Sequence, residues 1–289
     1  MDQFGKSGKK IPAFNAVLSA DVPIGAGLSS SAALESVTAF ALNTIYGTGF
    51  DTLELAKMAQ RAEHEYIGVR VGIMDMFASL HGKQGNAIRL DCRSLTYEYV
   101  PLELGQYKIV LMDTGVKHTL ASSEYNVRRS QCEQGVAILK KHNPGVKSLR
   151  DVTTKMLEEH KSEFDDIVYK RCYFVLEENK RVDRACEALQ TGSLDTVGQI
   201  MYASHLGLQN DYEVSCRELD LLVKLVQNET FVLGARMMGG GFGGCTINII
   251  HEDSIGALIA KIAPVYKENT GHELHTYEVV TGDGAKEVS

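Results

Sequence analysis

Apolar and polar residues in the first part of the chain predict one strand, a loop and then a helix. Residues Phe14–Val22 mix apolar and small side chains in a short run that suits a strand. The segment Pro23–Ser31 is rich in glycine and serine and predicts a loop. Ala32–Tyr46 has the composition of a helix, which the turn residues Gly47–Gly49 end.

The next helix is predicted from both its first residue and its apolar period. Asp51 is a good N-cap, because its side chain can accept hydrogen bonds from the first backbone N–H groups of a helix. Apolar residues then recur at spacings of four, three and four, which puts them on one helical face. They are Leu55, Ala59, Ala62 and Tyr66. A short helix over Ile73–Leu80 follows the turn at Gly68–Gly72.

The rest of the chain has the pattern of strands, then helices, then strands again. The first strand-like stretches are Asn86–Cys92, Thr96–Val100 and Tyr107–Val116. An almost wholly helical region, Ser122–Asn228, follows and is broken near Asn143–Gly145 and at Thr191–Gly192. The last part is predicted as strand, glycine loop, strand, helix and strand over Ala235–Met238, Gly239–Gly244, Cys245–His251, Ser254–Asn269 and Glu273–Val279. This order predicts an α+β fold with two strand-bearing lobes, residues 1–118 and 119–289.

Composition and charge narrow the class of protein. Of the 289 residues, 44% are hydrophobic and 23% are charged, which is typical of a globular protein. The formal net charge is −7, so the chain has no overall positive field to attract nucleic acid or anionic lipid. The six cysteines form no CxxC pair and indicate reduced thiols. No apolar run approaches the ~20 residues of a membrane helix, and we expect a cytoplasmic protein that binds neither nucleic acid nor membrane.

The stretch Pro23–Glu35 carries the clearest chemical pattern. It reads PIGAGLSSSAALE, in which glycines let backbone N–H groups approach a ligand and serines offer hydroxyls. The loop enters a helix, whose first N–H groups have no internal partners and whose dipole favours negative charge. A phosphate suits this position, although a turn followed by an ordinary serine-capped helix has the same residues. No Gly-Lys-Ser/Thr follows, so the loop is not a Walker loop.

Two acidic residues behind this loop are candidates for metal binding or proton transfer. Phosphoryl transfer needs charge neutralisation on the nucleotide and a base near the attacking hydroxyl. Glu63 lies one helical turn after Ala59, and by itself its ordinary interpretation is a solvated helix glutamate. Asp75 lies at a helix start and is flanked on both sides by apolar residues. Taken alone, a functional role for its carboxylate and a structural role in complementing the helix dipole are equal alternatives.

The whole string PIGAGLSSSAALE, between a strand and a helix, resembles the nucleotide-binding motif of the GHMP kinases. Within that superfamily, Gln60–His64 followed by Gly72–Asp75 resembles the galactokinases. The resemblance implies a two-lobed GHMP kinase fold with the nucleotide loop and active site in the cleft between the lobes. It also implies transfer of the γ-phosphate of ATP to the anomeric hydroxyl of galactose.

The resemblance implies a role for each matching residue. The ATP phosphates would lie on the loop formed by Gly25, Ala26, Gly27, Leu28, Ser29, Ser30 and Ser31. Ser31 and Glu63 would hold Mg²⁺, whose preference for hard oxygen ligands suits a hydroxyl, a carboxylate and phosphates. Asp75 would take the proton from the sugar C1 hydroxyl, and Gly72 and Tyr125 would contact the sugar.

Matches to the family continue from about residue 14 to 286 of the sequence. They include Asp91–Leu95, His118–Arg129, Asp211–Cys216 and the glycine-rich Arg236–Cys245. We expect the loop Gly239–Gly244 to face the nucleotide loop across the cleft. Val71 and Met76 depart from the family pattern, in which cysteine and glutamine are common, and they leave room for a related sugar such as N-acetylgalactosamine.

One motif of the family has no counterpart. Galactokinases carry an N-terminal string resembling GRVNLIGEHTDY, whose charged residues approach the sugar, and this sequence has no such string. We therefore expect a chain with a truncated or divergent start, which in this form is a weak or inactive kinase. A non-catalytic sensor of sugar and ATP is the alternative from a different class of protein. The presence of Ser31, Glu63 and Asp75 argues against that alternative.

Overall fold

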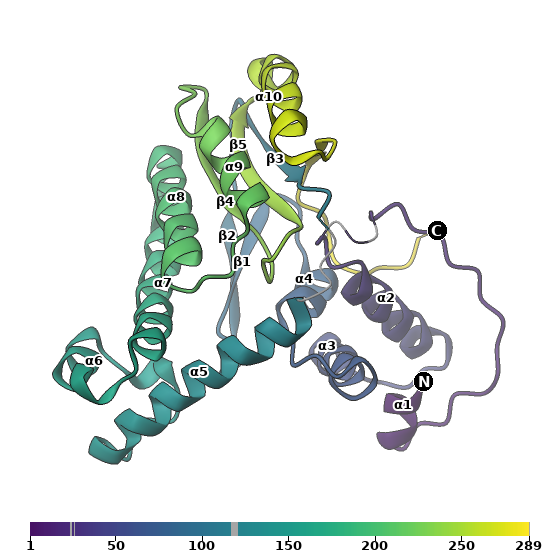
Figure 1. Cartoon of the computed structure of the whole chain (residues 1–289). Coiled ribbons are helices and arrows are strands. Elements are labelled where there is room, and N and C mark those ends of the chain that lie inside the picture. Colours follow the sequence, from purple (N-terminus) through teal and green to yellow (C-terminus); the bar gives the residue numbers. More distant parts are fainter. Residues whose placement is uncertain (24, 26, 117–120, 289) are drawn as a thin grey trace. The chain divides into compact units, whose positions relative to one another are not determined.

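The computed structural model describes residues 1–23, 25, 27–116 and 121–288 (Figure 1). Contacts divide the chain into two compact units, the first made of Met1–Glu103 with Val280–Ser289 and the second of Leu104–Val279. The first unit is therefore discontinuous in sequence, because the end of the chain returns to it. The contact division falls earlier than residue 118. The predicted lobes 1–118 and 119–289 stay a prediction, since contacts alone do not test which segments act together.

The first unit is mainly helical, with one small antiparallel sheet. Its elements are α1 (Asp2–Lys6), α2 (Ser30–Ile45), α3 (Thr52–Ala62), the π-helix η1 (Glu63–Ile67), α4 (Met74–His81), β1 (Asn86–Leu90) and β2 (Tyr97–Pro101). The core between α2, α3 and α4 includes Leu42, Leu55 and Phe77, all almost fully buried. The predicted N-cap is confirmed, because Asp51 accepts from the backbone N–H of Glu54 in a reciprocal capping box.

The structure contradicts two predictions for this unit. Phe14–Val22 forms no strand, and Val17 is 98% exposed, because a strand needs a hydrogen-bonded neighbour and the described residues supply none. Tyr66 lies outside the apolar face of α3 and is 87% exposed. The reason is the π-helix, whose wider turn interrupts the α-helical period after Ala62.

The second unit combines a four-stranded sheet with long helices. Its elements are β3 (Tyr107–Asp113), α5 (Ala121–His142), η2 (Leu149–Asp151), α6 (Thr154–Glu159), η3 (Lys161–Glu163), α7 (Asp166–Gln190), α8 (Leu194–Asn210), α9 (Arg217–Val226), β4 (Val232–Met237), β5 (Cys245–His251), η4 (Glu252–Ser254), α10 (Ile255–Thr270) and β6 (His275–Val279). The predicted breaks after α5 and α7 are confirmed, while the sequence did not predict the breaks around η3 and before α9.

The sheet of the second unit is antiparallel throughout, in the order β4-β5-β3-β6. Successive residues of a strand point to opposite faces, and Ile249 and Ile250 of β5 accordingly enter different cores. Ile250 packs with α9 and α10, whereas Ile249 packs with α8, so helices cover both faces of the sheet (Figure 1). This mixture of helices and strands is the predicted α+β class.

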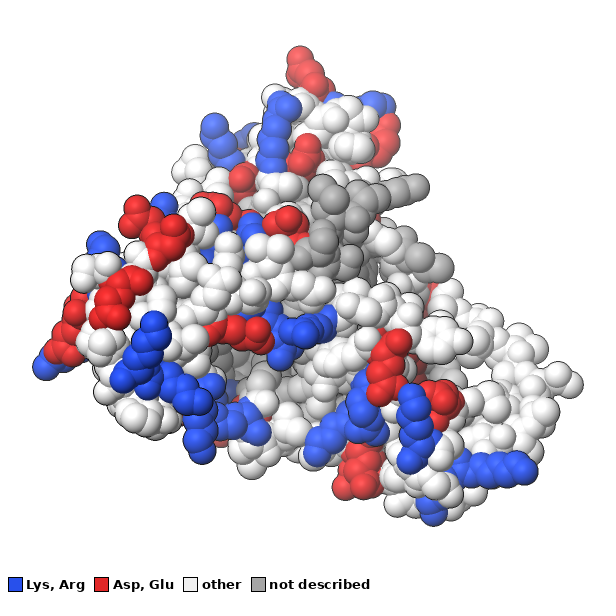
Figure 2. Space-filling view, turned by 60° about the horizontal axis from the view of Figure 1, so that its bottom comes forward, with Lys and Arg blue, Asp and Glu red and all other residues white. Residues whose placement is uncertain are grey.

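Charged side chains of both signs are interspersed on the molecular face shown in Figure 2. Many form ion pairs that are largely open to water, such as Arg89 with Glu98 and Lys108 with Glu252. Each such pair contributes little to stability because water and salt screen it. Within the described residues, the helices are all too short or too polar to cross a bilayer.

Candidate active site

The predicted nucleotide loop has a backbone that turns repeatedly in the left-handed region. Gly25, Gly27 and Ser29 have φ angles of 84°, 72° and 54°, while Ala26 lies outside the described residues. Ser29 is the N-cap residue of α2, yet among the described residues no side chain caps this N-terminus. Ser30 and Ser31 begin the first turn of α2. The N–H groups of this turn therefore remain available to an anion.

The hydroxyl of Ser29 has a different partner. It donates a 2.6 Å hydrogen bond to the carboxylate of Asp75, which is half-buried in the first turn of α4. A bond of this length to an ionised carboxylate is strong and directional. It joins the nucleotide loop directly to the residue predicted as the base.

The turn that leads into Asp75 is held by two side chains. The backbone carbonyl of Val71 accepts from the Gln60 amide at 3.0 Å and lies 2.8 Å from Nε2 of His64. Gly72, the predicted sugar contact, is exposed just after this anchor, and Ile73 is buried just beyond it. Anchors on both sides fix the start of α4 and hence the position of Asp75.

Glu63 is the most buried of the predicted acidic residues, with only 7% of its surface exposed. It opens the π-helix η1, where the Glu63 carbonyl accepts from the N–H of Gly68. Single π-helical turns inside α-helices frequently occur at functional sites. The sequence pattern predicted a continuous α-helix here and gave no sign of this turn.

Glu35 belongs to the same acidic region, although the sequence analysis gave it no role. One of its carboxylate oxygens is buried and has no hydrogen-bond partner among the residues that the structure describes. Burial, and secondly the charge of Glu63, raise the pKa of Glu35 to about 7. Glu35 is half-buried and Glu63 is buried, and a bound cation would stabilise two carboxylates whose charges act on each other.

The predicted metal ligands suit a hard cation. Ser31 and Glu35 are four residues apart on α2 and so share one helical face. The charge of Glu63 acts on the Glu35 carboxylate. A hydroxyl and carboxylates are the oxygen ligands that Mg²⁺ prefers. The i, i+4 spacing of Ser31 and Glu35 was the signal in the sequence that could have identified Glu35.

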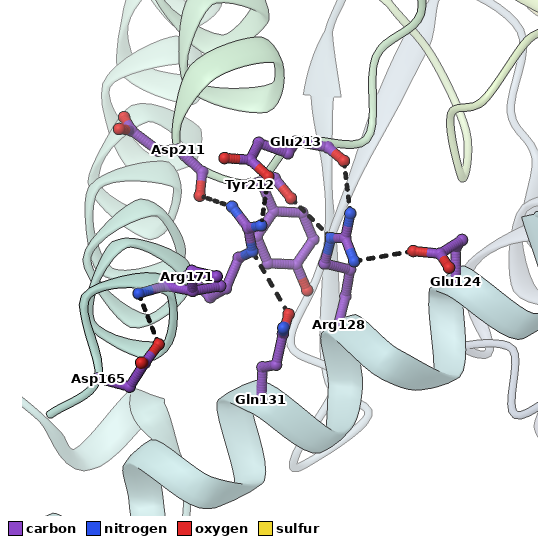
Figure 3. A network of polar contacts seen from close by, with 9 residues as sticks. Glu124, Arg128, Gln131, Asp165, Arg171, Asp211, Tyr212 and Glu213 are labelled. Atoms are coloured by element: carbon purple, nitrogen blue, oxygen red, sulfur yellow. Dashed lines mark hydrogen bonds and ion pairs between the residues drawn. The ribbon is translucent and has the colours of Figure 1, made fainter.

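Tyr125, the second predicted sugar contact, lies in the second unit near the start of α5 and is half-buried. It is close to Tyr212, whose pKa is raised by burial and, in smaller part, by the charges of Cys132 and Tyr125. In the next turn of α5, Arg128 is 8% exposed and donates to the backbone carbonyls of Tyr212 and Glu213 at 2.8 and 2.7 Å. The same guanidinium pairs with Glu124 at 3.0 Å (Figure 3).

A second buried arginine holds the same loop from α7. Arg171 is 2% exposed and donates to the Asp211 carbonyl, to the Glu213 carboxylate at 2.7 Å and to the Gln131 amide at 3.4 Å (Figure 3). The charge-assisted bond from Arg171 to the Glu213 carboxylate lowers the pKa of Glu213. Two arginines from two helices therefore fix the segment between α8 and α9.

This segment in turn supports the C-terminal glycine loop. The Val214 carbonyl accepts from the N–H of Phe242 at 2.8 Å, and a Cβ on Gly241 would lie only 2.0 Å from the same oxygen. Gly241 therefore must be glycine, both for this close approach and for its φ of +84°. The arginines act on the glycine loop through Val214, a connection that the sequence did not reveal.

Comparison with known proteins gives the family. The model for the GHMP kinases N terminal domain matches residues 1–83, and the model for the GHMP kinases C terminal domain matches residues 185–268. A galactokinase of Thermotoga maritima is 42% identical over 285 residues, which cover 99% of this chain and 79% of that protein. The chain belongs to the galactokinase family.

Other galactokinases and their relatives agree with this assignment. The galactokinase of Exiguobacterium sibiricum is 41% identical over 94% of this chain and 69% of its own length. The crystal structure of Lactococcus lactis galactokinase complexed with galactose matches with a TM-score of 0.92 at 33% identity, over 99% of this chain and 74% of that one. The predicted GHMP kinase fold is thereby confirmed, and the protein is a sugar kinase, a phosphotransferase. The mevalonate kinase of L. major, at 20% identity and a TM-score of 0.54, shares the fold alone.

A large cavity in the second unit of this galactokinase-family chain has a lining that includes none of the predicted site residues among those the structure describes. It has a volume of about 980 Å³ and is lined by residues of α8 and α9, among them His205, Gln209 and Asp220.

Proposed function

We propose that the protein transfers the γ-phosphoryl group of ATP to the C1 hydroxyl of galactose. The observation that carries the proposal is the 2.6 Å contact from Ser29 to Asp75, which joins a phosphate-type loop to a carboxylate. Identity of 42% to a galactokinase over 99% of the chain supports the choice of galactose as the acceptor.

The residues of the chain divide the reaction between them. Backbone N–H groups of the loop Gly25–Ser31 and of the α2 N-terminus bind the phosphates. Asp75 accepts the proton of the C1 hydroxyl as its oxygen forms a bond to the γ-phosphorus and the bond to ADP breaks. Ser29 orients the carboxylate, because the oxygen that accepts its hydrogen bond is fixed and leaves the other oxygen to face the sugar. Gly72 and Tyr125 contact the sugar in this proposal.

Mg²⁺ is the proposed companion of ATP. Ser31 and Glu63 would hold it, with Glu35 beside them, and when bound it neutralises charge on the nucleotide phosphates. The partnerless oxygen of Glu35 supports this assignment, since a cation in this region would remove the cost of leaving it unpaired.

A single-turnover experiment tests the function. The protein is mixed in excess over galactose with Mg·ATP, and the sugar product is identified by ³¹P NMR, so that even slow transfer is registered. We expect galactose 1-phosphate from galactose and no sugar phosphate from 1-deoxygalactose, which lacks the accepting hydroxyl. N-acetylgalactosamine is run in parallel to measure sugar preference.

Binding of nucleotide is measured separately. Titration calorimetry with Mg·AMP-PNP should show one site per chain, and Gly27→Val should weaken it, since a β-branched residue cannot adopt the φ of +72° at that position without strain. A protein that binds Mg·AMP-PNP and yet forms no galactose 1-phosphate would contradict the proposed activity. A phosphate on any hydroxyl other than that of C1 would contradict the role of Asp75.

A further inference from the structure

Three potential metal ligands meet in the second unit at the end of α5. His142 is the last residue of α5, His160 follows α6, and Glu163 ends the short helix η3. The backbone next to these three residues is held by the core, because the neighbouring Leu139 and Leu157 are almost fully buried in one hydrophobic cluster. Elements distant in sequence therefore present their side chains at one fixed place on the surface.

The three side chains already contact one another. The carboxylate of Glu163 lies 2.9 Å from Nε2 of His142 and 3.1 Å from Nδ1 of His160. The two imidazole rings stack with centroids 3.8 Å apart and planes 16° from parallel. Hydrogen bonds from His142 and, less strongly, from His160 lower the pKa of Glu163, so its carboxylate is ionised at neutral pH.

We propose that His142, His160 and Glu163 bind Zn²⁺. Two imidazole nitrogens and one carboxylate oxygen, with a water in the fourth position, are an established ligand set for this ion. The three ligand atoms all lie within 4.8 Å of one another. Zinc bonds near 2.0–2.1 Å require ligand atoms roughly 3.3 Å apart in a tetrahedron, close to the observed contacts.

Charges of both signs surround the cluster, since Lys140 and Lys141 share the last turn of α5 with His142. A Zn²⁺ ion held by both rings would take the place of the hydrogens through which they bond the Glu163 carboxylate. The negative end of the α5 dipole lies at His142. The nearby ammonium of Lys161 is directed to the ring of Tyr169, 4.9 Å from its centroid.

Binding requires only a small local rearrangement. The rings must open from their parallel stack so that both lone pairs point at one ion, which rotation about the Cβ–Cγ bonds provides. The histidines are exposed or half-buried, so the rotation displaces water rather than packed side chains. The nitrogen ligands also separate this site from the proposed Mg²⁺ region, because Mg²⁺ prefers oxygen ligands.

Titration calorimetry with ZnCl₂ on the tag-free protein, in a buffer that contains excess Mg²⁺, tests the proposal. We expect one Zn²⁺ per chain with micromolar affinity. His142→Ala and His160→Ala should each weaken binding by about tenfold or more. Glu163→Gln keeps the shape of the side chain and loses its charge, and it should weaken binding too. His275→Ala, which removes an exposed histidine of β6, is the matched control and should bind as the parent does.

Cobalt supplies a second readout that reports coordination itself. Co²⁺ in a tetrahedral site with nitrogen ligands gives visible d–d absorption bands, which should appear in the parent and in His275→Ala and be lost in His142→Ala. Circular dichroism of each metal-free variant checks that it folds. Zinc affinity and cobalt bands that stay unchanged in His142→Ala and His160→Ala would overturn the proposal, as would the absence of any Zn²⁺ binding by the parent.

Discussion

The Ser29 hydroxyl hydrogen-bonds to Asp75 and does not cap the N-terminus of its own helix, α2. An N-cap serine ordinarily accepts a hydrogen bond from the first turn, and this adds about 1 kcal/mol of stability. Here the hydroxyl is the donor, so the helix N–H groups remain open to a phosphate and the acid gains an orienting contact. One residue therefore serves both the nucleotide loop and the proposed base.

Replacing Asp75 by asparagine tests the base. We expect kcat for galactose to fall by about 10²–10⁴, because the amide cannot accept the hydroxyl proton. Affinity for Mg·AMP-PNP should stay near the parental value. Ser29→Ala is predicted to lower kcat by a smaller factor, since it removes orientation and leaves the base in place.

The matched comparison is Glu63→Gln, which removes charge from the proposed metal ligand. Excess Mg²⁺ should restore part of its activity, whereas no concentration of Mg²⁺ should restore Asp75→Asn. Steady-state assays at several Mg²⁺ concentrations separate the two roles. A parental kcat in Asp75→Asn, or an equal response of both variants to Mg²⁺, would refute the assignment.

His81 makes the stability of the first unit depend on pH. Burial lowers the pKa of its ring, which stacks on Phe77 at 3.9 Å and lies 2.9 Å from the hydroxyl of Thr52. Because the folded-state pKa is below the ordinary value of 6.5, the neutral ring contributes stability that is fully present above pH 6.5. That contribution is lost as the pH falls through the lowered folded-state pKa.

We therefore expect the urea midpoint of unfolding to fall on acidification below pH 6.5, and to fall less in His81→Gln. An NMR titration of the His81 ring protons should give a pKa under 6.5 in the folded protein. A measured pKa at or above that value would show that the ring is not held neutral by burial.

At the scale of helices and strands, the sequence predicted most elements and failed where tertiary structure overrides local pattern. Periodicity located α3 but could not foresee η1, since a π-turn is decided by the packing around Glu63. Apolar composition suggested a strand at Phe14–Val22, yet strand formation depends on a partner that the segment itself does not encode. The Ser29–Asp75 contact joins residues 46 positions apart, which no local pattern reports.

The contact between α8 and β4 leaves no room for a side chain. A Cβ on Gly198 would lie 1.9 Å from the carbonyl oxygen of Leu233 in the backbone of β4. Gly198→Ala should therefore destabilise the protein by at least about 2 kcal/mol, because neither backbone can yield without disturbing the sheet.

The control for this change is Gly256→Ala in α10, where a Cβ would meet no atom of the described residues within 4 Å. That substitution should stabilise the protein by about 0.5–1 kcal/mol, since alanine restricts the unfolded chain and favours helix. Urea unfolding curves of both variants give the comparison. Equal effects of the same sign would mean that the α8–β4 contact is looser than the structure indicates.

Arg171 is predicted to hold the glycine loop indirectly, through the segment between α8 and α9. Arg171→Lys should cost about 2–4 kcal/mol, because a lysine ammonium cannot reach the carbonyl, carboxylate and amide that the guanidinium bonds. Hydrogen exchange should become faster at the N–H of Phe242, which donates to the Val214 carbonyl, and at the N–H of Val214, which donates to the Leu208 carbonyl.

The same substitution at Arg129, an exposed residue of α5, serves as the control. It should change stability by less than about 0.5 kcal/mol, as expected for a solvent-screened pair. Unchanged exchange at Phe242 in a folded Arg171→Lys protein would separate Arg171 from the glycine loop.

At the scale of the whole molecule, the chain closes on the unit with which it begins. The backbone N–H groups of Gly284 and Ala285 donate to the carbonyls of Gly82 and Ser79 at 2.8 and 2.9 Å. The N–H of Gly85 donates to the Thr281 hydroxyl at 2.7 Å. The predicted lobes were continuous in sequence because hydrophobic pattern shows where elements lie and not which of them share a core.

Removing residues 280–289 should leave those partners at the end of α4 unpaired. We expect hydrogen exchange to accelerate over residues 79–86, while the sheet of the second unit, including β6, exchanges as before. Mass spectrometry of exchanged peptides measures both regions at once. Unchanged protection at residues 79–86 would show that the last segment contributes no stability to the first unit.

This closure also determines when each unit can be completed during synthesis. A ribosome releases the chain from its N-terminus, and domains generally fold in that order. Here the second unit has all its residues once Val279 has emerged, whereas the first unit still lacks its final segment. The unit that contains residues 1–103 is therefore completed after the unit that follows it, and until the segment from Val280 onward emerges the end of α4 is open to water, chaperones and proteases.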